Sequence, residues 1–157
     1  MTPGPAREET AVNETIRKFG YPETRVAEYR SWVVLLRPQQ VTLGSLVLAS
    51  RTEATAFGAL PAEAFDGLRQ AVHDLEQVLK AAFAFDRINY LMLMMVDPNV
   101  HFHVLPRYSG ERDFAGVRFV DRSWPKPPDL SQSTPLEEGQ RLQLRDFLRR
   151  QWPTAAA

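Results

Sequence analysis

The chain has 157 residues, 19 basic and 19 acidic side chains, 44% hydrophobic residues and no cysteine. This is enough for one domain with a sizeable core, and the lack of cysteine excludes disulfide scaffolds and cysteine-based zinc sites. The balanced charge argues against non-specific nucleic-acid binding, and the longest apolar run, Leu91 to Val96, is too short to span a bilayer. We therefore expect a soluble, cytoplasmic protein with no membrane partner.

The N-terminal part of the sequence divides into an arm and the start of a domain. Residues 1–12 are rich in proline and offer little that could pack, so we expect a mobile arm there. A single domain is expected over residues 13–157, with a C-terminal extension over 108–157. Trp32 to Leu36 and Leu46 to Ala49 are short apolar runs on either side of turn-forming residues, which predicts two strands joined by a turn.

The clearest helix of the sequence begins at Pro61, a residue suited to the first helical position. Its apolar positions step by three and four, as in a helix with one buried face: Phe65, Leu68, Val72, Leu75, Leu79 and Ala82. Two apolar runs of strand length follow, Ile88 to Val96 and Val100 to Leu105. The turn-forming triplet Asp97-Pro98-Asn99 separates them, so we expect a hairpin covered by the helix.

The remainder of the chain predicts a long excursion followed by a second helix. Tyr108 to Ser133 is rich in Gly, Pro, Asp and Ser, and Thr134-Pro135 is expected to cap the helix that comes next. Acidic residues in its first turn, Glu137 and Glu138, and basic residues in its last turn suit the helix dipole. The fold class predicted is α+β, a twisted antiparallel sheet of about five strands with a long helix packed on it and a C-terminal helix.

The segment from Asn99 to Arg107 carries the chemistry. Side chains alternate along a strand, so Asn99, His101 and His103 share one face while the apolar residues between them share the other. The apolar row would pack under the helix and the imidazoles would lie on the opposite surface, with α-carbons about 6.6 Å apart. Two imidazoles this close can divide the roles of nucleophile and acid or charge stabiliser.

A metal site is the competing interpretation, because two histidines two residues apart on a strand form a common pair of zinc ligands. Such a site needs a third ligand. His73 falls on the charged face of the helix, which is typical of a solvated surface, and Asp97, Glu111 and Asp113 are the remaining candidates. We expect no metal. The alternatives left open are a metal-dependent hydrolase and a protein that binds its ligand without turnover.

The stretch His101-Phe102-His103-Val104-Leu105-Pro106-Arg107 resembles the end of the histidine triad motif, His-φ-His-φ-His-φ-φ, where φ is apolar. The order strand, strand, helix over Trp32 to Arg107 resembles the same family, and Phe19 to Gln40 is similar to a divergent bacterial subgroup. The resemblance implies a homodimer without a cofactor. It also implies hydrolysis or transfer at the α-phosphate of a nucleoside phosphate derivative, of the dinucleoside polyphosphate or nucleoside phosphoramidate type.

The roles that the resemblance implies can be assigned residue by residue. His101 matches the middle histidine, which attacks phosphorus to form a nucleotidyl-histidine, and His103 matches the third, which contacts a phosphate oxygen or assists the leaving group. Asn99 stands where the first histidine belongs, so Asn99→His is expected to maintain or raise activity. Arg37 lies near a position that often binds ribose, and Arg107 is a cation at the end of the strand. Both are expected to bind substrate.

The resemblance is incomplete in one further respect. The family usually has a loop with Gly and Gln before the motif, and the polar groups of that loop hold the α-phosphate. The corresponding stretch here, Val96-Asp97-Pro98, is short and contains neither residue type.

Overall fold

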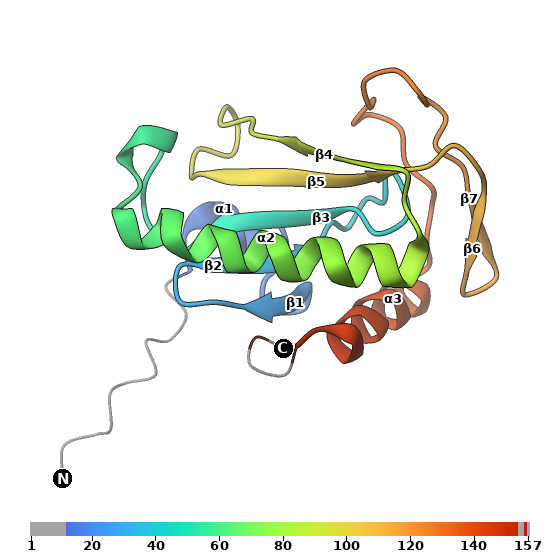
Figure 1. The fold of residues 1–157 in the computed structure, drawn as a ribbon, viewed down its shortest axis with the longest axis horizontal. Coiled ribbons are helices and arrows are strands. Elements are labelled where there is room, and N and C mark those ends of the chain that lie inside the picture. Colours follow the sequence, from blue (N-terminus) through green and yellow to red (C-terminus); the bar gives the residue numbers. More distant parts are fainter. Residues whose placement is uncertain (1–11, 154–155, 157) are drawn as a thin grey trace, which may run out of the picture.

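The structure, a computed structural model, describes residues 12–153 and 156. The arm expected over residues 1–12 therefore lies outside the described residues except for Val12. Five antiparallel strands form one sheet in the order β1-β2-β3-β5-β4 (Figure 1), which confirms the predicted fold class. The strands are β1 (Arg25–Glu28), β2 (Trp32–Leu36), β3 (Leu46–Ser50), β4 (Arg87–Leu91) and β5 (His101–Arg107).

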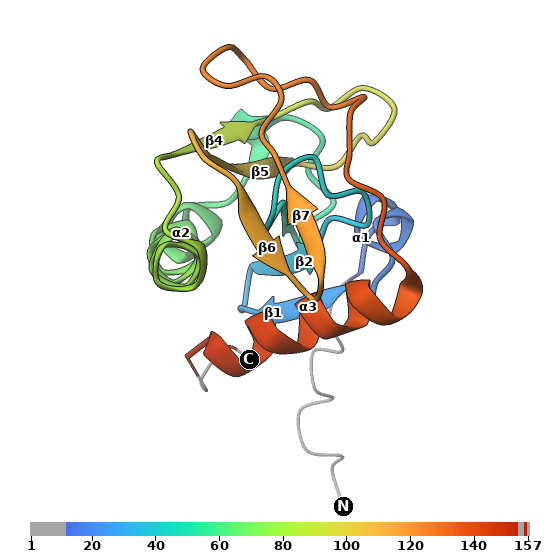
Figure 2. The same ribbon diagram turned by 90° about the vertical axis from the view of Figure 1, so that its right-hand side faces the viewer.

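Helices cover both faces of this sheet (Figure 2). The long helix α2 (Ala62–Phe83) lies on one face, preceded by a single 3₁₀ turn, η1 (Phe57–Ala59), and the short helix α1 (Glu14–Lys18) lies on the other. The C-terminal helix α3 (Glu138–Gln151) packs beside β1. Among the described residues, no helix combines the length and the apolar character needed to cross a bilayer.

The two faces of the sheet bury different sets of side chains. The alternation along β2 sends Trp32 and Val34 into the large core under α2, and Val33 and Leu35 into a smaller core under α1. The turn before β3 lies close against α2, since a Cβ at Gly44 would come within 3.1 Å of Leu79 and Phe83. The positive φ of Gly44, +85°, likewise suits glycine.

The long helix differs from its expected orientation by a small rotation. Pro61 is the N-cap rather than the first helical residue, and the expected core residue Phe65 is 41% exposed. The fully buried positions are instead Ala64, Ala71, Leu75 and Leu79. Alanine at two of these positions lets the helix pack close to the sheet. A prediction that looks for large apolar side chains on the buried face overlooks such alanines.

The expected hairpin has different strand ends. The first strand stops at Leu91, which is opposite His103. Val100, just before the second strand, is bound to β3, where the N–H of Ser50 donates to the Val100 carbonyl at 2.9 Å. The second strand continues through Pro106 and Arg107, which were expected to end it. Beyond Val104, β5 has a partner only in β4, and proline is tolerated at such an edge.

The excursion after β5 contains a hairpin that the sequence analysis did not predict, formed by β6 (Arg112–Phe114) and β7 (Val117–Phe119). Its turn places Ala115 and Gly116 at positive φ, as a two-residue turn of type I′ requires. The last helix begins at Glu138 with Glu137 as its N-cap, so the expected cap at Thr134-Pro135 is wrong. Thr134 instead forms an isolated bridge with Gln40, which ties the end of the excursion to the loop after β2.

Candidate active site

The two histidines lie side by side on β5, facing the layer that contains α1. His101 is opposite Ala49 of β3 and His103 is opposite Val47, and these β3 residues belong to the smaller core. The imidazole centroids are 5.1 Å apart with ring planes at 79°. The strand therefore presents both rings on the face opposite α2, as the alternation predicts, but both rings are buried.

The protonation of His101 follows from its one hydrogen bond. Its Nδ1 lies 2.7 Å from the backbone carbonyl oxygen of Asn99, and because a carbonyl only accepts, Nδ1 carries the proton. The other ring nitrogen, Nε2, is therefore a lone-pair acceptor. It is buried and has no hydrogen-bond partner within residues 12–153 and 156. A neutral imidazole nitrogen with a free lone pair can act as a nucleophile.

The surroundings of His103 keep it neutral. Burial lowers the pKa of His103 to about 4, and the nearby Arg37 guanidinium lowers it in the same direction, against a smaller opposing effect of Asp97. Its Nδ1 accepts a hydrogen bond of 3.3 Å from the Nε of Arg37, which leaves the proton on Nε2. At neutral pH His103 is therefore a hydrogen-bond donor without a charge.

Arg37 reaches the histidine pair from the end of β2, so the structure brings together the side chains of three of the five predicted residues, His101, His103 and Arg37. The loop that carries Arg37 is organised by Gln40, a fully buried residue that the sequence analysis did not single out. The Gln40 amide donates to the carbonyls of Arg37 and Ser45 at 2.7 and 2.8 Å and accepts from the N–H of Gly44 at 2.9 Å. Nothing in the local pattern distinguishes Gln40 from its neighbour Gln39, so no sequence signal could have identified it.

The side chain of Asn99 is engaged with other parts of the fold. Its Oδ1 accepts hydrogen bonds from the hydroxyl and the N–H of Thr15 in α1, at 3.1 and 3.4 Å, and its Nδ2 donates to the Glu53 carbonyl at 3.2 Å. In return the N–H of Asn99 donates to the Thr15 hydroxyl. Asn99 thus anchors α1 to the start of β5, while its backbone carbonyl orients His101.

This anchored helix covers the candidate site. The ring of Phe19, at the end of α1, has its centroid 5.6 Å from both imidazole centroids. Lys18 forms an ion pair with Asp97, which adds a second link between α1 and the segment before β5. The expectation of imidazoles on the surface is therefore wrong, because a five-residue helix and one aromatic ring are enough to bury them.

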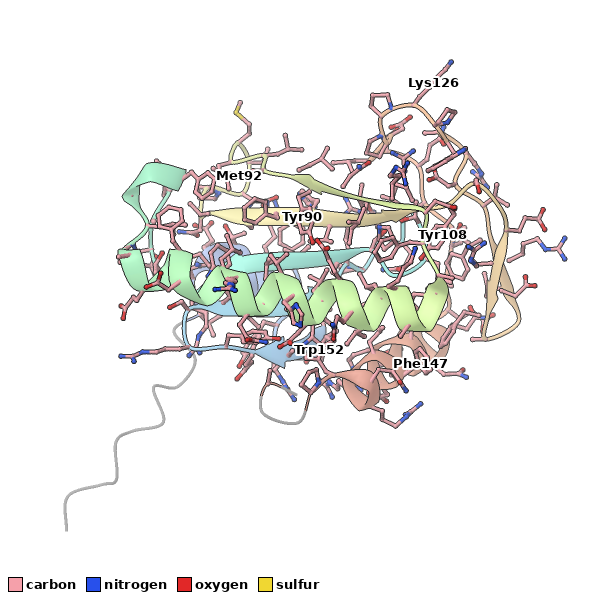
Figure 3. The ribbon with its side chains drawn as sticks, viewed as in Figure 1. Tyr90, Met92, Tyr108, Lys126, Phe147 and Trp152 are labelled. Carbon is pink, nitrogen blue, oxygen red and sulfur yellow. The ribbon has the colours of Figure 1, made fainter. Side chains whose placement is uncertain are left out.

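The remaining predicted residue, Arg107, lies at the far end of β5. Its guanidinium forms a two-point ion pair with Asp121 at 2.7 and 3.2 Å and donates to the Asn89 side chain and the Lys126 carbonyl, each at 2.8 Å. Figure 3 shows the Lys126 side chain pointing away from the sheet, so only its backbone is held. These contacts fasten the excursion to β5, and they occupy the groups with which Arg107 was expected to bind substrate.

The candidate third metal ligands are engaged elsewhere. Asp97 pairs with Lys18, and Glu111 and Asp113 both pair with Arg118 on the β6–β7 hairpin. In the described part of the chain no group of three His, Cys, Asp or Glu side chains is arranged to hold a metal ion. Two arginines of α3 are also held by the fold, since Arg145 and Arg149 donate to the carbonyls of Glu23 and Arg25.

No protein-family model matches this sequence, and no curated protein is detectably similar to it. Solved structures do match. A histidine triad protein of Sinorhizobium meliloti is 16% identical over 92% of this chain and 98% of its own, with a TM-score of 0.70. One from Bradyrhizobium japonicum is 17% identical over 90% and 97%, with a TM-score of 0.69. A hypothetical histidine triad nucleotide-binding protein of Sulfolobus tokodaii is 16% identical over 82% of each chain, with a TM-score of 0.62.

These proteins define the class of fold. At identities of 16–17% the shared feature is the three-dimensional arrangement, and it extends over nearly the whole length of the two rhizobial proteins. The chain described here has the histidine triad fold, in which the sequence carries two histidines and an asparagine where the motif has three histidines.

Proposed function

We propose that this protein is a divergent histidine triad enzyme that hydrolyses or transfers a nucleotidyl group at the α-phosphate of a nucleoside phosphate derivative. The observation that carries the proposal is the state of His101: its Nδ1 proton is held by the Asn99 carbonyl, and its Nε2 lone pair is buried without a partner. The nucleotide-binding description of the protein from Sulfolobus tokodaii, which shares the fold, supports the substrate class.

The first step forms a bond between Nε2 of His101 and the phosphorus. The bond from phosphorus to the leaving group breaks, and its electron pair leaves with that group. The positive charge that develops on the imidazole is stabilised by the carbonyl of Asn99, which accepts a hydrogen bond from Nδ1–H throughout. In the second step water, or the hydroxyl of another acceptor, attacks the phosphorus and releases its proton to solvent. The P–N bond breaks, and Nε2 regains its lone pair.

The second histidine has a different role in this mechanism. Because its pKa is about 4, His103 is not a cation at neutral pH and does not act as a strong acid toward the leaving group. Its Nε2–H instead donates a hydrogen bond to an oxygen of the reacting phosphate, which stabilises the charge of the transition state. Dinucleoside polyphosphates suit this arrangement, since their leaving groups are themselves phosphates that depart without strong acid assistance.

A screen of nucleotide conjugates by mass spectrometry tests the proposal. The unmodified protein should release a nucleoside monophosphate from at least one dinucleoside polyphosphate or nucleoside phosphoramidate, and His101→Ala should release none. The matched control is His73→Ala, which removes the exposed histidine of α2 and should leave turnover unchanged. Equal turnover by His101→Ala and the unmodified protein would contradict the proposal, and nucleotide binding without any product would identify a binding protein instead.

The assembly expected from the resemblance is a homodimer, and we propose that two copies adjoin at β4. This strand is last in the sheet order, so within the described residues one of its edges has no strand partner. Light scattering at micromolar concentration should give twice the mass of the chain. A monomeric mass would contradict the proposed dimer without bearing on the chemistry of His101.

A further inference from the structure

Arg37 is a buried cation without a counterion. Its side chain is embedded in the fold with 8% of the residue exposed, and its guanidinium donates to two neutral acceptors, the Nδ1 of His103 and the carbonyl of Gln39. Within residues 12–153 and 156 no carboxylate forms an ion pair with it. Burial lowers the pKa of Arg37, with no carboxylate acting in the opposite direction.

Arg107 shows what this fold does with a buried arginine that has a structural role. Arg107 is 4% exposed, comparable to Arg37, yet it is held by the carboxylate of Asp121 at two points and by two further oxygens. Removing an unpaired charge from water costs several kcal/mol, which a structural site offsets with an opposite charge. No carboxylate offsets the desolvation free energy of Arg37 in this way within residues 12–153 and 156. An anionic ligand bound at Arg37 would offset it.

The position of Arg37 is also fixed in advance. Gln40 binds the Arg37 carbonyl and closes the loop by accepting from the N–H groups of Gly44 and Ser45. Thr134 pairs with the same loop from the other side. A guanidinium held in place before the ligand arrives loses little entropy on binding, as an anion-binding group should.

His103 connects this cation to the nucleophile. Its ring is 5.1 Å from the ring of His101, centroid to centroid, and its Nδ1 is 3.3 Å from the Nε of Arg37. In the register of the sheet His101 is level with Val33 and His103 with Leu35, so Arg37 lies beyond His103 on the side away from His101. A ligand that spans His101 and Arg37 needs one phosphoryl group at Nε2 of His101 and a second anionic group about one imidazole's width away.

We infer that Arg37, next to His103, forms an anion subsite that binds a second phosphoryl group of the substrate, adjacent to the one that His101 attacks and His103 contacts. The inference rests on the proposed function for the identity of the first phosphoryl group. It narrows the substrate class to compounds with two neighbouring phosphoryl groups, such as dinucleoside polyphosphates, over phosphoramidates of a single phosphate. The guanidinium provides donors with the fork geometry that phosphate oxygens accept.

Calorimetric binding of pyrophosphate to the His101→Ala protein tests the subsite apart from catalysis. Pyrophosphate should bind more tightly than inorganic phosphate or succinate, because only pyrophosphate carries two linked phosphoryl groups. Adding Arg37→Met should weaken pyrophosphate binding by at least about 10-fold, the value of charge-assisted hydrogen bonds. Arg37→Lys should weaken it less. The matched control is Arg69→Met, which removes the same charge from an exposed position on α2 and should have no effect.

Thermal unfolding without ligand separates this role from a structural one. Arg37→Met should unfold at the same temperature as the unmodified protein or higher, since it removes an unpaired buried charge, whereas Arg107→Met should unfold at a lower temperature. Equal pyrophosphate affinity with and without Arg37, preferential binding of succinate, or a loss of stability in Arg37→Met as large as in Arg107→Met would overturn the inference. If pyrophosphate binds through Arg37 but the unmodified protein forms no nucleotidyl adduct on His101, the subsite stands and the proposed function is wrong. If the adduct forms but pyrophosphate binding does not depend on Arg37, the proposed function stands and the subsite is wrong.

Discussion

The link between Asn99 and Thr15 gives a prediction that contradicts what the motif alone suggests. The motif suggests that Asn99→His would restore a complete triad and maintain or raise activity. In the structure Asn99 is buried, and its side chain makes three hydrogen bonds, two with Thr15 and one with the Glu53 carbonyl. A larger imidazole cannot reproduce these bonds. We therefore expect Asn99→His to destabilise the protein and to loosen α1 rather than to improve catalysis.

The magnitude follows from the bonds lost. Each buried hydrogen bond contributes about 1 kcal/mol net, and a buried partner left unpaired costs a further 1–3 kcal/mol. Asn99→Ala, which removes all three bonds, should therefore lower the free energy of unfolding by about 2–4 kcal/mol. Thr15→Val removes the hydroxyl of the same link and should cost about 1–2 kcal/mol. Because the two side chains are in contact, the double variant should be less destabilised than the sum of the single variants by about 0.5–1.5 kcal/mol.

Guanidinium denaturation followed by tryptophan fluorescence measures these free energies. Thr55→Val, which makes the same change at an exposed position, is the matched control and should stay within about 0.5 kcal/mol of the unmodified protein. Additive effects of Asn99→Ala and Thr15→Val, or an Asn99→His variant that is as stable as the unmodified protein and more active, would show that Asn99 does not anchor α1 in this way.

Three further predictions concern the neighbours of the site. The pKa of His103 is about 4 when folded and about 6.5 when unfolded, so the unfolded chain binds more protons between these values, and stability should fall by up to about 1.4 kcal/mol per pH unit as the pH drops from 6.5 to 4. An NMR titration showing an ordinary pKa for His103 would contradict this. Phe19→Ala should expose both imidazoles and speed their acylation by diethyl pyrocarbonate, and an unchanged rate would show that Phe19 does not cover them. Arg107→Met leaves Asp121 buried and unpaired and should cost about 3–5 kcal/mol in denaturation experiments, whereas a cost below about 1 kcal/mol would show that the ion pair does not hold the excursion.

The strands of the sheet and the shared face of the two histidines could be predicted because they follow from local sequence patterns. Alternation over Asn99 to Leu105 depends only on the two-residue period of a strand, so the common orientation of His101 and His103 could be predicted. The long helix was predicted for the same reason, with a rotation error, because alanine contacts do not stand out in an apolar pattern. Strand ends were predicted less well, since they depend on where neighbouring strands stop, as at Leu91 and Arg107.

The tertiary contacts of the site could not be predicted from local patterns. Thr15 and Asn99 are 84 residues apart and Arg37 and His103 are 66 apart, so neither link has a periodic signature. The two arginines proposed to bind substrate look alike in the sequence, each next to a proline. Their difference comes from Asp121, which the excursion brings to Arg107 and not to Arg37.

The proposed mechanism requires a covalent bond between Nε2 of His101 and the phosphorus of the substrate. Rapid mixing with a dinucleoside polyphosphate, quenching under alkaline conditions that preserve phosphorus–nitrogen bonds, and peptide mass spectrometry measure this directly. We expect a mass increase of one nucleoside monophosphate less water on the peptide that contains His101, located on that residue by fragmentation and absent from His101→Ala. An adduct on His103 or on any other residue would contradict this mechanism. Turnover by the His101→Ala variant would contradict it as well.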